Sequence, residues 1–169
     1  MAVDARALSN IILQEAERLG IDVYATTLLK VLYFAHGWHL AISGEPLVAQ
    51  PFEAWQFGPV VRVVYDQIKN SNRRPIDIRL SAFSAAALQS VEAQCELKHA
   101  SFDLLISVLR AYSHLHPYTL SDMTHEADSP WSKVWLRSTQ GLTPGARIEN
   151  SEIRKYFLRQ NAADVLGRG

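Results

Sequence analysis

The stretch that decides the fold is Leu28-Leu29-Lys30-Val31-Leu32-Tyr33-Phe34-Ala35-His36-Gly37-Trp38-His39-Leu40. Apolar side chains lie on almost every side of this segment when it is drawn as a helix. A helix without a polar face is typical of the buried centre of a domain. Thr26 or Thr27 is suited to cap its start, and Gly44 to end it. We therefore predict a central helix around which the rest of the chain packs.

Before and after this helix, shorter patterns predict further elements. Asp4 caps an amphipathic helix that Gly20 ends. Residues 52–57 alternate and are aromatic, which predicts a short strand, and Gly58-Pro59 ends it and starts a helix that reaches Ile68. Residues 76–80 also alternate and predict a second short strand. Ser84 then caps a helix that runs to Cys95.

The C-terminal half reads as a series of helices. Their predicted starts are Ser101, Pro117, Pro130 and either Asn150 or Ser151, each a capping residue or a proline suited to the first turn. We predict a mainly α, compact single-domain fold of six to eight helices with a small two- or three-stranded β element. The domain is expected to cover residues 1–160, and residues 161–169 to form a flexible C-terminal tail.

Composition narrows the class of protein. The 169 residues suit one domain, and 17 basic residues balance 17 acidic ones, so the excess of positive charge typical of nucleic-acid binding is absent from the sequence. Cys95 has no second cysteine to pair with, which indicates a reducing compartment. The start of the chain does not resemble a signal peptide, and the longest apolar run is interrupted by Lys30 and His36. We expect a cytoplasmic protein without a membrane anchor.

Residues able to carry chemistry do not form a known constellation. His36 and His39 lie three apart, and Cys95 and His99 four apart, but neither pair matches the spacing of a zinc site. A cysteine among apolar neighbours is usually inert. The sequence contains no glycine-rich phosphate loop and no nucleophile elbow. We therefore predict no catalytic residue, no cofactor and no metal.

The aromatic and basic residues suggest a binding surface instead. Aromatic side chains gather between residues 38 and 65, and basic ones between residues 62 and 79. Interface anchors are enriched in tryptophan, tyrosine and arginine, although these aromatic residues also suit a core and the basic stretch also suits a solvated turn. Trp38 is the expected anchor. The candidate partner-binding residues are Trp38, His39, Trp55, Phe57, Arg62, Arg73 and Arg74.

Four short motifs together resemble the Panacea domain of SocA-like antitoxins. They are Leu28 to Ala41 with Gly44-Glu45-Pro46-Leu47, Phe52 to Val60 with Val64-Tyr65, Leu120 to Glu126 with Ser129-Pro130-Trp131, and Ile148 with Ile153 and Tyr156-Phe157. The matching residues within them include Lys30, Tyr33, His36, Trp38, Gly58, Pro59, Tyr65, Thr124, His125, Pro130 and Trp131. Phe57 departs from the family, where many members have tyrosine.

The resemblance implies an antitoxin that binds a cognate toxin protein directly. SocA-type members are linked to delivery of the toxin to an AAA+ protease of the ClpXP kind. Two alternatives stay open at this point. One is a DNA-binding autoregulator that uses the basic stretch from Arg62 to Arg79, and the other is a small hydrolase that uses His36, His39 or His125.

Overall fold

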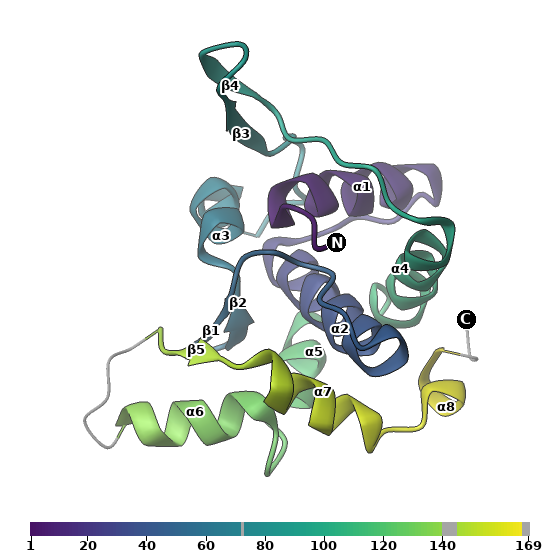
Figure 1. Ribbon diagram of the computed structural model, residues 1–169, viewed down its shortest axis with the longest axis vertical. Helices are drawn as coiled ribbons and strands as arrows, with labels where there is room; N and C mark the ends of the chain where they lie inside the picture. Colours follow the sequence, from purple (N-terminus) through teal and green to yellow (C-terminus); the bar gives the residue numbers. More distant parts are fainter. Residues whose placement is uncertain (72, 140–144, 167–169) are drawn as a thin grey trace.

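The computed structural model describes residues 1–71, 73–139 and 145–166 (Figure 1). Its elements in chain order are α1 (Ala5–Arg18), α2 (Ala25–Ser43), β1 (Phe52–Trp55), β2 (Gly58–Val60), α3 (Arg62–Ile68), the 3-10 helix η1 (Lys69–Ser71), β3 (Ser81–Ser84), β4 (Gln89–Glu92), α4 (His99–Tyr112), α5 (Pro117–Thr124), α6 (Pro130–Thr139), β5 (Arg147–Ile148), α7 (Asn150–Leu158) and α8 (Ala162–Leu166). The mainly helical fold with a small β element is therefore confirmed.

Helix α2 lies at the centre of the molecule, as its apolar sequence predicts (Figure 1). Helices α1, α3, α4, α5 and α7 and strand β2 all contact it. Leu28, Val31 and Leu32 on α2 are fully buried. The helix ends at Gly44 as predicted, but it begins at Ala25 after Tyr24, and no side chain caps it. The predicted threonine cap is therefore wrong, and α2 is stabilised by packing on all its faces without a side-chain cap.

Strand β1 pairs with β2 and with β5 in an antiparallel sheet of order β2-β1-β5. Trp55 faces Gly58 across the turn, and Phe52 faces Ile148. Gly58-Pro59 therefore belongs to a strand, and α3 begins later, at Arg62. The prediction that Pro59 starts a helix was wrong because the chain turns back on itself at Gln56-Phe57 and pairs with β1 first.

A second hairpin, β3–β4, replaces the helix predicted to run from Ser84 to Cys95. Leu88 is 81% exposed and Val91 is 37% exposed, so the segment lacks the buried face that stabilises a helix. The strand predicted at residues 76–80 is also absent. There, Ile76 donates its N–H to the Val23 carbonyl, and the Leu80 N–H is bound by the Asn10 side chain, so helix α1 and the loop after it take the place of a neighbouring strand.

The C-terminal helices largely follow the sequence pattern. Helices α5 and α6 begin at Pro117 and Pro130 as predicted, and α7 begins at Asn150, one of its two predicted starts. Helix α4 begins at His99, ahead of the predicted Ser101. The segment for which we expect flexibility contains the short helix α8, whose Val165 packs against the core. In the described part of the chain, no helix combines the length and the apolar character needed to cross a bilayer.

Candidate functional site

Residues from three distant motifs meet behind the β1–β2 turn. Lys30 comes from α2, Gly58 from β2 and Thr124 from α5. A Cβ added to Gly58 would lie 2.6 Å from Thr124 Oγ1 and 2.7 Å from Lys30 Nζ, and the backbone φ there is +108°. Only glycine fits such a close approach in that conformation. The family motifs thus build one support for the turn that carries Phe57.

Lys30 is the buried charge of this support. Its side chain is 1% exposed, and Nζ donates a 3.3 Å hydrogen bond to the Pro59 carbonyl. Burial without a compensating charge lowers the pKa of Lys30 to about 7. The ammonium is therefore partly deprotonated near neutral pH.

His125 and Trp131 continue the support toward α6. The two rings stack with centroids 3.9 Å apart, and Trp131 Nε1 donates a 2.7 Å hydrogen bond to the Trp55 carbonyl. The Nε2 atom of His125 is buried, and no described residue hydrogen-bonds to it. Burial and the nearby Lys30 lower the pKa of His125, so its ring is biased toward the neutral form. The hydrogen bond from Trp131 thus holds the β1 backbone at Trp55, and the stacked His125 ring holds Trp131 in place.

On the outer side of the turn lies a group that we call the aromatic–arginine cluster: Trp55, Phe57, Arg62 and Tyr65. The Arg62 guanidinium carbon lies 5.1 Å from the Trp55 ring centroid, and Tyr65 meets the same ring edge-on at 4.8 Å. Glu53 accepts hydrogen bonds from Arg62 at 2.7 Å and from Trp55 Nε1 at 2.9 Å. Phe57, at the turn, is 65% exposed. The cluster combines fixed aromatic rings with an exposed one.

Two other family-motif residues of α2 are structural. His36 is 1% exposed: Nε2 donates to Asn150 Oδ1 at 2.9 Å, and Nδ1 accepts from the Val48 N–H at 3.1 Å. Burial lowers its pKa to about 4, so the ring is neutral at pH 7. Tyr33 is buried against Phe52, and burial raises its pKa. Both side chains join α2 to the β1 and α7 regions.

Trp38 is a core residue, which corrects its assignment as the surface anchor. It is 2% exposed, its ring meets Phe157 edge-on at 5.1 Å, and Nε1 donates to the Tyr112 hydroxyl at 3.1 Å. An indole held in this way is inaccessible to a partner while the domain is folded. The apolar helix pattern around it was the better guide to its position.

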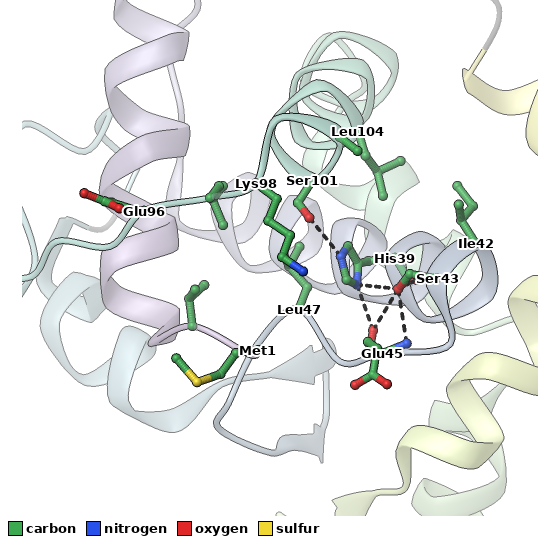
Figure 2. A pocket seen from close by; sticks show the side chains of 13 residues that line it. Met1, His39, Ile42, Ser43, Glu45, Leu47, Glu96, Lys98, Ser101 and Leu104 are labelled. Carbon is green, nitrogen blue, oxygen red and sulfur yellow. Dashed lines mark hydrogen bonds between the residues drawn. The ribbon is translucent and has the colours of Figure 1, made fainter.

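His39 lies at a groove between the end of α2 and the start of α4 (Figure 2). Its Nδ1 lies 2.7 Å from the Glu45 carbonyl oxygen, which only accepts, so Nδ1 carries the proton and Nε2 accepts from Ser101 Oγ at 3.1 Å. The groove has a volume of about 440 Å³, and Met1, Val3, Ile42, Leu47, Leu97 and Leu104 give it an apolar lining.

Sequence reasoning missed this groove because its walls come from three separate segments. The available signal was the apolar Ile42 near the end of α2, where it is 64% exposed. Alone, that signal does not locate the opposite wall. The rim carries the charged residues Glu45, Glu96 and Lys98.

Arg73 and Arg74 lie apart from the aromatic–arginine cluster. Both are exposed and follow η1, whereas Arg62 begins α3 and Tyr65 lies within it, so the last turn of α3 and η1 separate the two arginines from the cluster along the chain. The Arg74 N–H bonds to the Ser71 carbonyl at 3.0 Å, which shapes this loop. Of the candidate partner-binding residues, the structure thus brings together Trp55, Phe57 and Arg62.

Within residues 1–71, 73–139 and 145–166, no three histidine, cysteine, aspartate or glutamate side chains are placed to hold a metal ion. Cys95 lies in the loop before α4, and burial raises the pKa of its thiol, which favours the unreactive protonated form.

Comparison with known proteins adds a relationship over most of the chain. A family model described as "Antitoxin SocA-like, Panacea domain" matches residues 28–132. A protein of Caulobacter vibrioides (strain NA1000 / CB15N) named Antitoxin SocA is 53% identical over 165 residues, which cover 96% of this chain and 86% of the relative. No solved structure matches the chain. The likeness therefore extends well beyond the motifs that build the β1–β2 turn.

Proposed function

The chain belongs to the family of SocA-like antitoxins with a Panacea domain, and we propose that it neutralises a toxin protein by binding it directly. The observation that carries this proposal is the 53% identity to Antitoxin SocA across 96% of the chain. In this proposal, the protein acts without a cofactor and without catalysing a reaction. Its partner is a cognate toxin.

The aromatic–arginine cluster is the proposed centre of the contact. Phe57 offers apolar area that the fold does not use, and Arg62 over Trp55 adds a cation held by Glu53. Aromatic residues and arginine are enriched among residues that hold most of the binding energy of an interface. The buried support formed by Lys30, Gly58 and Thr124 keeps this turn in one conformation before binding, which reduces the entropy lost on association.

We further propose that the complex delivers the toxin to an AAA+ protease of the ClpXP kind. This step follows from the resemblance to SocA-type adaptors. It leads to an expectation that binding alone does not. The half-life of the toxin should shorten when this protein is present in cells that contain the protease. In cells without the protease, the toxin should stay long-lived even when it is bound.

One observation favours the hydrolase alternative. Ser101 Oγ donates to His39 Nε2 in an apolar groove, as a serine nucleophile and its base would. However, Nδ1 of His39 is oriented by a backbone carbonyl, where a catalytic triad has a carboxylate. Covalent labelling of Ser101 by a fluorophosphonate would favour this alternative. The DNA-binding alternative rests on the basic stretch from Arg62 to Arg79, in which Arg62, Lys69, Arg73 and Arg74 are exposed.

The test of the main proposal is co-expression with the product of the neighbouring gene. Growth should be arrested by that product alone and restored when this protein is co-expressed, and a tagged copy should retain the toxin in a pull-down. Normal growth with either gene alone, or arrest that co-expression does not relieve, would contradict toxin neutralisation by this pair.

A further inference from the structure

The β3–β4 hairpin projects from the body of the protein beyond α1 and α3 (Figure 1). Residues 80–91 include no charged side chain, and Phe83 and Leu88 are 68% and 81% exposed. Exposed strands are normally protected by charges, prolines or bulges because their free backbone groups pair with other chains. This hairpin has no charge or proline between Leu80 and Val91.

The two edges of the hairpin differ. The backbone N–H and carbonyl of Ser81 both bond to the Gln67 side chain, at 2.9 and 2.8 Å, so they point away from β4. Ser81 faces Glu92, and in an antiparallel pair outward-pointing residues face each other and alternate with inward-pointing ones. Ser90 and Glu92 therefore direct their backbone groups outward from β4. No described residue bonds to those groups, whereas Gln67 already occupies part of the β3 edge.

An isolated two-stranded hairpin is marginally stable, and a third strand would complete it. We propose that the outer edge of β4 receives an extended segment of the toxin as a third, backbone-paired strand. This inference rests on the proposed function, because the occupant is the toxin. It adds to the aromatic–arginine cluster a second contact, one that uses backbone hydrogen bonds and depends little on the toxin's side chains.

The charge at the end of the β4 edge indicates which side chains the added strand should carry. After the uncharged stretch from Leu80 to Val91, β4 ends at the exposed Glu92, beside a hollow of about 520 Å³ that Arg79 and Glu17 also line. Arg79 is engaged with Glu17 at 2.7 Å. Glu92 therefore remains the carboxylate without a cationic partner among the described residues around this hollow. An apolar strand with a lysine or arginine opposite Glu92 is the complementary occupant.

The backbone of Ser90 allows a sharp test. Ser90→Pro removes the outward N–H and leaves the β3–β4 bonds in place, since proline is tolerated where a strand's N–H faces solvent. Ser90→Ala removes the hydroxyl and keeps the N–H, so it is the matched control. The binding probe is the purified product of the neighbouring gene, and thermal melts verify that both variants stay folded.

We expect Ser90→Pro to weaken binding by roughly tenfold or more, while Ser90→Ala binds like the parent. In the parent complex, the amides of Ser90 and Glu92 should become protected from hydrogen exchange. Equal binding by both variants together with unprotected amides would overturn strand addition.

The outcomes also separate this inference from the proposed function. If the parent binds and neutralises the toxin but Ser90→Pro does so equally, only strand addition fails. If the parent binds no toxin, the proposed function fails and the inference falls with it. If sedimentation shows that the parent alone forms a dimer that Ser90→Pro dissolves, the occupant is a second copy of this chain, and the assignment to the toxin is overturned.

Discussion

The side-chain amine of Lys30 is buried, and burial disfavours its protonated, charged form. Its pKa is lowered from 10.5 to about 7 by burial. Between these two values the unfolded chain binds a proton that the folded chain lacks, so the stability of the parent should rise with pH across this window. Below pH 7 the full cost of burying the charge is present. The slope is at most about 1.4 kcal/mol per pH unit.

Lys30→Met should therefore stabilise the protein at pH 6, and the gain should shrink as the pH approaches 10. Urea denaturation of parent and variant at pH values from 6 to 10 measures this difference. Lys98→Met, at an exposed position, is the control and should follow the parent at every pH. Parallel curves for the parent and Lys30→Met would show that Lys30 keeps its ordinary pKa in the folded state.

The role of Lys30 also marks a limit of sequence reasoning at this scale. The sequence identified Lys30, Gly58 and Thr124 as family-motif residues, but their spacing along the chain does not predict that they touch. Their contact depends on a positive φ at Gly58 and on the packing of α5 against β2. Both arise from tertiary structure, so a pattern within one segment does not contain them.

At the scale of elements, α2 shows how far a local pattern reaches. Its apolar residues recur on every side, and this alone was sufficient to predict that it lies in the centre. Trp38 shares that pattern, yet we assigned it to the surface because aromatic residues are frequent in interfaces. Burial of Trp38 against Phe157 and Tyr112 shows that the periodicity of the helix outweighs the preference of a residue type.

Trp38→Ala should therefore destabilise the fold rather than act on binding alone. Removing a buried tryptophan costs about 3–5 kcal/mol, a large part of a typical stability of roughly 5–15 kcal/mol. Urea denaturation followed by circular dichroism measures this loss. Phe57→Ala, at an exposed aromatic residue, should change the stability by less than about 0.5 kcal/mol. A Trp38→Ala protein as stable as the parent would place this indole outside the core.

The β3–β4 hairpin shows where a local pattern fails. Leu88, Val91 and Cys95 have the spacing of a helix face, and Ser84 resembles a cap. A helix needs a core surface to cover, and this segment has none, since it projects from the body of the protein. Where the rest of the chain leaves no surface for the apolar face, helical spacing by itself does not decide the structure.

At the scale of the whole molecule, the proposed contacts combine the aromatic–arginine cluster, whose residues are close along the chain, with the distant edge of β4. Trp55, Phe57 and Arg62 can be predicted to be neighbours because they lie close along the chain. The same pattern groups them with Arg73 and Arg74, which the structure places beyond the other end of α3. Neither the groove at His39 nor the open edge of β4 was predicted, because each depends on how whole elements are arranged.

If the protein binds a toxin as proposed, this separation predicts different roles for the aromatic and the basic residues in that binding. The net charge is zero, so long-range attraction has to come from local groups such as the exposed Arg73 and Arg74. Arg73→Glu combined with Arg74→Glu should slow association with the toxin about tenfold at low salt, weaken its dependence on salt, and leave dissociation nearly unchanged.

Phe57→Ala is the matched contrast to this double variant and should mainly speed dissociation, because apolar anchors hold a formed complex together. Stopped-flow kinetics at several salt concentrations separate the two effects. If the double variant associates like the parent at low salt, the basic loop takes no part in the encounter, and attraction must come from elsewhere on the surface.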